Sequence, residues 1–212
     1  MGKQNTSMKI QWNGTTGGVV GYSIRGHHYT RSLADNVRNP RTEAQQEARA
    51  KFAYVSQLIH DFGGIHLTGY RHYNVDINQR ANFSQNLYHS AVSGNRTDGY
   101  TVDWTKVMVS KGNLAKLYQI TASVAAATQT VSLSWNDNSG VGDALPTDRL
   151  LVCVFNVTKR LAIVRESLAA RSAESAEVSY PSDWGGDTLY VYAGLTNGTA
   201  ESQSVCMGPY TA

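Results

Sequence analysis

The sequence predicts an α+β protein in which N-terminal strands and a helical hairpin precede a C-terminal β-sandwich. Three observations predict this fold. Residues 8–33 alternate β-forming segments with glycine-rich turns, which is typical of hairpins. Residues 42–62 repeat apolar side chains at three- and four-residue spacing, which indicates a helix. From Leu114 onward the chain shows short, regularly spaced strand patterns and no helical period.

The change of pattern near Asn113 predicts two domains, an α+β domain over residues 1–113 and a β-sandwich domain over residues 114–212. A chain of 212 residues is long enough for two small domains. Hydrophobic residues make up 41% of the chain, whereas charged residues make up only 17%. Low charge together with 12 tyrosines is typical of surfaces that contact other proteins.

The net charge of +3 permits contact with nucleic acid, but phosphate binding usually requires a stronger, clustered excess of Lys and Arg. The start of the chain leads into no apolar run of signal-peptide length, and nowhere are 18 consecutive residues apolar. We therefore expect a protein of the cytoplasm or of a virion that has no membrane partner.

The first 35 residues are expected to form strands at Lys9–Trp12, Val19–Ile24 and His27–Leu33, joined by glycine-rich turns. The sequence does not fix how these strands pack. The glycines of residues 13–18 also resemble a phosphate-binding loop, but no Gly-Lys-Ser/Thr ending follows, so the turn interpretation is preferred.

The helix of residues 42–62 carries the clearest local signal. Pro40 forces the preceding residue out of the helical region, Thr42 can cap the first turn, and Gly63-Gly64 ends the helix. We expect one apolar stripe to face inward along its length: Ala44, Ala48, Phe52, Val55, Ile59 and Phe62.

A second helix is expected from Val75 to Val92, and with the first it would form a hairpin laid against the N-terminal strands. A strand is expected to follow over Tyr100–Ser110. The inward face of the second helix is predicted to consist of Ile77, Ala81, Ser84, Leu87, Tyr88 and Ala91.

The C-terminal half resembles immunoglobulin-like or fibronectin type III modules in layout, although it has no diagnostic motif. We expect one of Tyr190 and Tyr192 to face the core and the other to form a hydrogen bond at a corner. Seven strands are predicted, at Gln119–Ala125, Thr130–Trp135, Arg149–Asn156, Leu161–Glu166, Ala176–Tyr180, Thr188–Leu195 and Ser202–Met207.

The two cysteines, Cys153 and Cys206, both fall in this half. Because no export signal is evident, we expect two buried, reduced thiols. A disulfide between neighbouring strands remains the alternative.

Several segments together carry a family resemblance. They are Gly17-x-Val19-Val20-Gly21, Arg38-Asn39-Pro40-Arg41-Thr42-x-Ala44-Gln45-x3-Arg49-x2-Phe52, Asp103-x-Thr105-Lys106-Val107-x-Val109-Ser110-Lys111-Gly112-x-Leu114, Ser134-Trp135-x-Asp137-Asn138-Ser139-Gly140 and Pro181-x-Asp183-Trp184-x-Gly186-Asp187. Over nearly its whole length the chain resembles a family of uncharacterised Bacteroidetes proteins with no assigned activity. Its helix-start motif is also similar to one in small tailed-phage proteins encoded near structural genes. The resemblance implies no catalytic residue, and it favours a virion or phage-derived component.

No catalytic, cofactor-binding or metal-binding residue is predicted, and we expect the protein not to be an enzyme. His66 and His72 could gather around zinc with Asp61 or Asp76, but nothing in their spacing requires a metal site. No Gly-x-Ser-x-Gly motif is present, and Cys153 lies in an apolar run that predicts an inert thiol.

We therefore expect a structural or interaction protein with protein partners or self-association. The loops Asn136–Leu145 and Thr196–Thr199 would be presented by the sandwich. One alternative is a nucleic-acid-associated protein that uses the basic region 22–51, and another is a carbohydrate-binding or adhesive module. The candidate interaction surface comprises Trp12, Tyr22, Tyr29, Arg31, Arg38 and Arg41.

Overall fold

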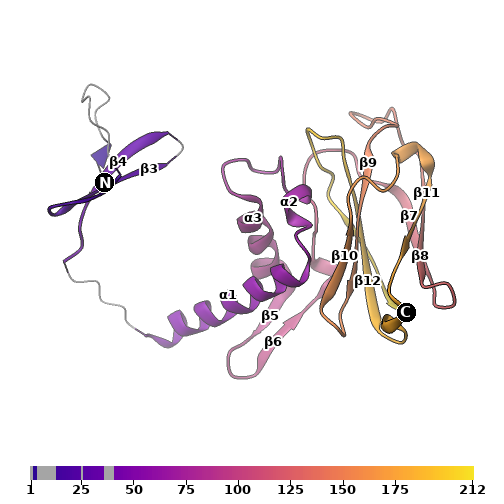
Figure 1. Ribbon diagram of the computed structural model, residues 1–212, viewed down its shortest axis with the longest axis horizontal. Helices are drawn as coiled ribbons and strands as arrows, with labels where there is room; N and C mark the ends of the chain where they lie inside the picture. Colours follow the sequence, from indigo (N-terminus) through magenta and orange to yellow (C-terminus); the bar gives the residue numbers. More distant parts are fainter. Residues whose placement is uncertain (1, 4–12, 25, 36–40) are drawn as a thin grey trace. The chain divides into compact units, whose positions relative to one another are not determined.

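The computed structural model describes residues 2–3, 13–24, 26–35 and 41–212 (Figure 1). The chain divides into two compact units, Met1–Thr42 and Glu43–Ala212, which are described separately. The predicted α+β class with an immunoglobulin/fibronectin-III-like sandwich is confirmed by the elements and by the order of their strands.

The N-terminal unit is an antiparallel sheet in the order β1-β4-β3-β2. Its strands are β1 (Gly2–Lys3), β2 (Gly14–Thr16), β3 (Val19–Ile24) and β4 (His27–Ser32). The predicted hairpins are present, and Gly17 adopts a φ of 57° in the turn between β2 and β3. The predicted strand Lys9–Trp12 lies outside the described residues.

The larger unit begins with the helices α1 (Glu43–Asp61), α2 (His66–Gly69), α3 (Gln79–Asn86) and the π-helical turn η1 (Leu87–Ala91). Two short 3₁₀ helices, η3 (Arg171–Ala173) and η4 (Ser182–Trp184), lie between strands of the sandwich. The first predicted helix is confirmed, and Gly63 and Gly64 end it with positive φ angles. No helix in the described part of the chain combines the length and the apolar character of a membrane span.

The second helix is shorter than predicted, because it begins at Gln79, where Asn78 caps it by accepting the Ala81 N–H at 2.8 Å. Its buried side is centred on Phe83, whereas Ile77 and Ser84 stay partly exposed. The predicted inward face is thus confirmed at Leu87 and Ala91, which are buried, whereas Ile77, Ala81, Ser84 and Tyr88 are only partly buried. The segment has few apolar residues, so its period is ambiguous, and the bulk of Phe83 decides which side is buried.

The predicted strand Tyr100–Ser110 is wrong beyond Val102. A hairpin of β5 (Val92–Asn95) and β6 (Gly99–Val102) is followed by a short 3₁₀ helix, η2 (Trp104–Lys106). The chain turns here because the Asp103 carboxylate accepts hydrogen bonds from the backbone N–H and the hydroxyl of Thr105.

The sandwich consists of one sheet in the order β10-β9-β12-β13 and another in the order β11-β8-β7. Six of the seven predicted strands agree within a residue at each end, and only the last lies further toward the C-terminus. The strands are β7 (Tyr118–Ala125), β8 (Thr130–Asn136), β9 (Arg149–Asn156), β10 (Leu161–Arg165), β11 (Ser175–Ser179), β12 (Thr188–Thr196) and β13 (Val205–Thr211).

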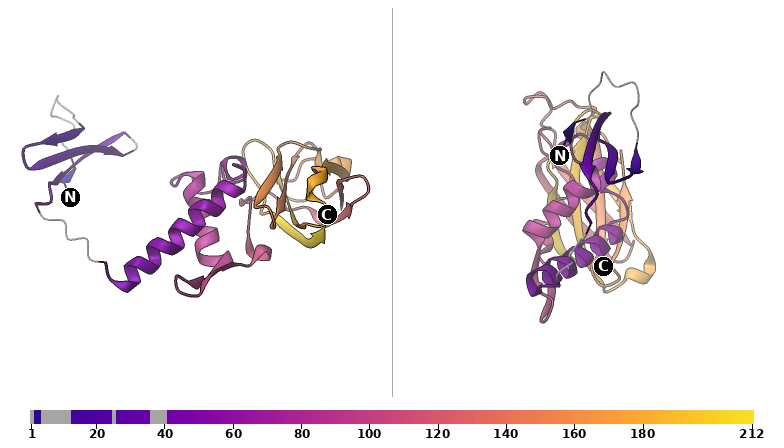
Figure 2. Two further views of the ribbon diagram at one scale, coloured as in Figure 1. Left: turned by 60° about the horizontal axis from the view of Figure 1, so that its bottom comes forward. Right: turned by 90° about the vertical axis from the view of Figure 1, so that its left-hand side faces the viewer.

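The larger unit has three layers, because the helices cover the outer face of the β10-β9-β12-β13 sheet (Figures 1 and 2). Val152 of β9 belongs to the core between the two sheets, whereas Phe155 of the same strand packs under the helices. The predicted boundary near Asn113 falls inside this unit. That residues 114–212 would fold as a domain of their own stays a prediction.

Tyr190 and Tyr192 share one face of β12, since strand side chains alternate with a period of two. Both pack in the core under the helices, and the hydroxyl of the fully buried Tyr192 donates to the Trp104 carbonyl at 2.9 Å. The expectation that these two tyrosines divide their roles between the core and a corner was wrong.

A tight seam joins the helical layer to the β12–β13 connection. A Cβ atom at Gly112 would lie 2.1 Å from the carbonyl oxygen of Glu201, so no side chain fits there. The Val109 N–H donates to Ser204 Oγ at 3.0 Å, and Ser110 Oγ donates to the Ser202 carbonyl at 2.9 Å. The Val109-Ser110-Lys111-Gly112 motif therefore has a structural role.

Candidate interaction surfaces

The first half of α1 extends beyond the core that its second half covers. Val55, Leu58 and Ile59 are buried, whereas Ala44, Ala48 and Phe52 are exposed, and the Phe52 side chain is 58% exposed. The expectation of one continuous buried stripe was therefore wrong at these three positions, because the helix is longer than the layer beneath it. We call Ala44, Ala48 and Phe52 the α1 stripe.

The exposed half of α1 is held in place by the β5–β6 hairpin. Glu47 Oε2 accepts the backbone N–H of Arg96 at 2.9 Å, and the Tyr100 hydroxyl donates to Glu47 Oε1 at 2.8 Å. The Arg96 N–H is the largest cause that lowers the pKa of Glu47, whereas desolvation and the bond to Glu47 raise the pKa of Tyr100 to about 12. The α1 stripe is thus presented on a fixed helix.

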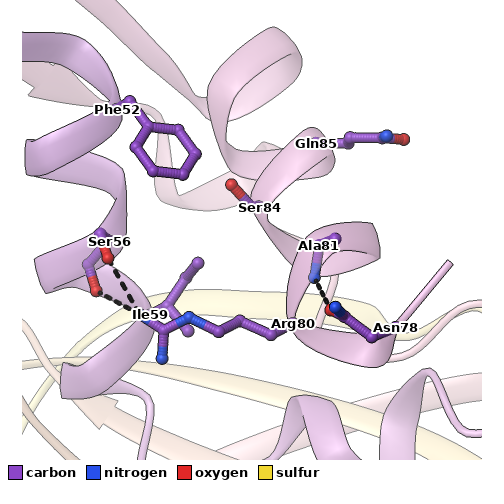
Figure 3. Close-up of a pocket in the computed structure, with 8 residues that line it drawn as sticks. All are labelled: Phe52, Ser56, Ile59, Asn78, Arg80, Ala81, Ser84 and Gln85. Atoms are coloured by element: carbon purple, nitrogen blue, oxygen red, sulfur yellow. Dashed lines mark hydrogen bonds between the residues drawn. The ribbon is translucent and has the colours of Figure 1, made fainter. Parts of the chain in front are cut away.

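Beside the α1 stripe lies a trough between α1 and α3, with a volume of about 330 Å³ (Figure 3). The ring of Phe52 lies between the two helices, and Arg80 spans from α3 to α1, donating to Ser56 Oγ at 2.9 Å. Phe52, Ser84 and Gln85 also line a second recess of about 210 Å³ with Tyr88 and His89. The lining residues of the α1–α3 trough are Phe52, Ser56, Ile59, Asn78, Arg80, Ala81, Ser84 and Gln85.

The N-terminal sheet brings together three of the six predicted surface residues. Tyr22 and Tyr29 are cross-strand partners whose rings stack with centroids 5.6 Å apart. Arg31 pairs with Val20 and is exposed on the same face, since it lies two residues beyond Tyr29.

The other three predicted surface residues are not placed on this face. Arg41 is exposed just before α1. Trp12 and Arg38 lie outside the described residues, so the predicted surface is seen only in part.

The two predicted surface loops of the sandwich, 136–145 and 196–199, come close to each other at one end of the sandwich. There they border a polar recess of about 330 Å³ together with the β10–β11 connection and α2. Its lining residues are Thr68, Arg71, Leu145, Thr147, Arg149, Glu166, Ser167, Thr196, Asn197 and Gly198.

The two histidines considered for a zinc site have other surroundings. The His66 ring is buried and stacks on Phe83, with centroids 5.8 Å apart, whereas His72 Nδ1 lies 2.7 Å from Glu201 Oε1. Asp61 forms an ion pair with Arg160 at 2.7 Å. Across residues 41–212 and the described N-terminal segments, no three His, Cys, Asp or Glu residues are grouped as metal ligands.

His66 predicts a pH dependence of stability. Burial, with a smaller contribution from Arg80, lowers the pKa of His66 below its ordinary value of about 6.5. The contribution of the neutral ring is therefore fully present above pH 6.5 and is lost as the pH falls toward the lower folded-state pKa. We expect the free energy of unfolding to fall more steeply between pH 7 and 5.5 in the wild type than in His66→Leu. Parallel curves from urea titrations would contradict this.

Both cysteines are free. Cys153 and Cys206 lie opposite Tyr192 on the two strands that flank β12, which sets their backbones about 10 Å apart. A disulfide needs Cα atoms closer than about 7 Å, so the register excludes a bridge between them. Cys153 is fully buried, as predicted, whereas Cys206 is only partly buried.

The cysteine environment predicts slow alkylation. Burial raises the pKa of Cys153, and it raises the pKa of Cys206 to about 11. Because the thiolate is the reactive form, iodoacetamide at pH 8 should label the native chain more than about a hundredfold more slowly than the same chain in denaturant. Mass spectrometry at timed intervals measures both rates, and equal rates would refute the prediction.

Fold and surfaces together define a class of protein, an immunoglobulin/fibronectin-III-like sandwich that carries a helical layer on one sheet. The sequence profile of a family of unknown function, DUF6266, matches residues 10–208, and the chain belongs to this family. No curated protein matches the sequence.

Among solved structures, the fn3 domain of human contactin 1 is similar to this chain at 10% sequence identity and a TM-score of 0.33. The alignment covers 48% of this chain and 87% of the contactin domain.

Proposed function

We propose that this protein is a non-enzymatic structural or interaction protein that works as a component of a larger assembly, such as a phage virion or a phage-derived particle. The observation that carries the proposal is the α1 stripe. A phenylalanine that is 58% exposed lies beside an open trough on a helix fixed by its neighbours. An exposed aromatic side chain beside an open trough offers a partner protein an apolar contact.

Two further features support the same function. Charged residues make up only 17% of the chain, as is typical of surfaces that become covered in an assembly. The similarity of the helix-start motif to tailed-phage proteins concerns the residues that lead into α1. On this proposal, the helix-start motif positions α1, the helix that carries the α1 stripe.

The size of the native particle tests this function. Material from the natural source is fractionated gently by size exclusion with light scattering, and the chain is followed with an antibody. We expect it to elute in a complex far larger than its own 23.1 kDa. Elution as a 23.1 kDa monomer without co-purifying protein would overturn the proposal.

A second candidate is binding of nucleic acid by the N-terminal sheet, favoured by the stacked Tyr22–Tyr29 pair with Arg31 on the same face. It predicts binding to a single-stranded oligonucleotide that weakens steeply with salt and is lost in the double substitution Tyr29→Ser, Arg31→Ser. Absence of binding at low salt would dismiss this candidate.

A further inference from the structure

We propose that the polar recess at one end of the sandwich binds a small carboxylate that also carries a hydroxyl group, such as a sugar acid. The inference goes beyond the proposed function, because the recess shares no lining residue with the α1–α3 trough beside the α1 stripe. The volume of the recess is about 330 Å³. Sites for small molecules usually measure roughly 300–1,000 Å³, so the recess is large enough for a single sugar-sized ligand.

Two arginines without a carboxylate partner line the recess. Arg71 follows α2 and Arg149 begins β9, and no ion pair among the described residues includes either of them. By contrast, Arg160 and Arg171 of the same unit each pair with an aspartate. Guanidinium groups bind carboxylates through two parallel hydrogen bonds, so the two unpaired arginines favour an anionic ligand.

Both arginines belong to well-anchored backbone. Arg149 pairs with Thr196 of β12 on one side and forms a β-bridge to Ala170 on the other. The Arg71 N–H donates to the Thr68 carbonyl at 3.2 Å, and the Arg71 guanidinium lies 3.5 Å from Thr68 Oγ1. Little backbone ordering is therefore needed when a ligand binds.

The uncharged groups of the recess are arranged to donate hydrogen bonds. Asn197 Oδ1 accepts the backbone N–H groups of Thr199 and Ala200 at 2.9 and 2.8 Å, so the end of this side chain that can serve a ligand is the amide nitrogen. Thr196 Oγ1 accepts the Gly198 N–H at 3.2 Å, which leaves the hydroxyl hydrogen to donate. A ligand group rich in acceptors, as a carboxylate is, complements both.

Glu166 selects the charge and the second functional group of the ligand. It lines the same recess, and no ion pair among the described residues includes it. Two arginines and one glutamate leave a net charge of +1 (2 − 1), which a monoanion balances and neither a phosphate dianion nor a zwitterion does. An ionised carboxylate only accepts hydrogen bonds, so Glu166 suits a hydroxyl group of the ligand.

The test is an NMR titration of the purified full chain at constant ionic strength and pH 7.5, where inorganic phosphate is mainly a dianion. Glucuronate should shift the amide signals of residues around the recess, and the shifts should saturate. Glucose has a similar hydroxylated ring without the carboxylate, and it should cause no such shifts. Arg71→Ala and Arg149→Ala remove exposed side chains, so both variants should fold, and each should weaken glucuronate binding by about tenfold or more.

Two further variants sharpen the result. Arg165→Ala removes an exposed arginine of β10 that does not line the recess, and it should leave glucuronate binding unchanged. Glu166→Gln removes the negative charge of the recess, so the affinity for inorganic phosphate should rise relative to the affinity for glucuronate.

Several outcomes would overturn the inference. They are the absence of saturable shifts with glucuronate, equal binding of glucose, and tighter binding of phosphate than of glucuronate by the wild type. Equal weakening by Arg165→Ala and Arg149→Ala would also overturn it, since the effect would then be one of overall charge. None of these outcomes affects the proposed function, which rests on the α1 stripe and is tested by the size of the native complex.

Discussion

Replacing Arg171 with alanine is expected to lower the free energy of unfolding by about 3–5 kcal/mol, the usual cost of removing one member of a buried ion pair. Arg171 and Asp148 are both fully buried, and the guanidinium donates to Asp148 Oδ2 at 2.8 and 3.0 Å. Arg171 also donates to the carbonyl of Ala115 and to the side chain of Asn138. Its loss leaves a buried carboxylate without its counter-charge. Urea unfolding followed by tryptophan fluorescence measures the change.

Arg149→Ala is the matched control. Arg149 is an exposed arginine beside the polar recess, and its removal should change stability by no more than about 0.5 kcal/mol. Hydrogen exchange should also become faster across the loop 137–148 in Arg171→Ala, because this arginine connects the loop to the rest of the sandwich. If both variants lost less than 1 kcal/mol, Arg171 would not have the role assigned to it.

The second large effect is expected from Phe62→Ala, which should lower the free energy of unfolding by about 3–5 kcal/mol. Phe62 is fully buried between the helices and the sheet. Its ring stacks on Phe155 with centroids 4.3 Å apart and meets the edge of Phe83 at 5.4 Å. Alanine would leave a cavity at the centre of the contact between these layers. Urea unfolding measures the loss, and hydrogen exchange should show faster opening of α1–α3.

Phe52→Ala is the control for this prediction, since it makes the same substitution on α1, the helix that Phe62 directly follows, at a residue that is 58% exposed. We expect it to cost under about 1 kcal/mol. Equal losses in the two variants would mean that the helical layer does not depend on Phe62.

The sandwich could be predicted from the sequence because its signals are local. Val131, Leu133 and Trp135 alternate along β8, which has one buried face. The uninterrupted apolar run Leu150–Phe155 carries a further signal. Such a run is typical of a strand buried on both faces, and it would have predicted a layer over β9.

The candidate surface could be predicted only in part. Helical periodicity places Ala44, Ala48 and Phe52 on the same side as the buried Val55, but it does not tell where the covered part of a helix ends. That limit depends on the extent of the layer beneath, which is set by distant residues such as Phe155 and Tyr192. By contrast, the pairing of Tyr22 with Tyr29 can be predicted from the sequence, because a short hairpin fixes its own register.

The most direct test of the account is photo-crosslinking from the α1 stripe in the native assembly. A photoreactive phenylalanine analogue is placed at position 52 or, as a control of similar exposure, at position 161. The account predicts strong crosslinks to a protein partner from position 52 and few from position 161. The claim that the protein works through this surface would be contradicted if the analogue at position 52 gave no crosslink to any protein while the same analogue at other positions did.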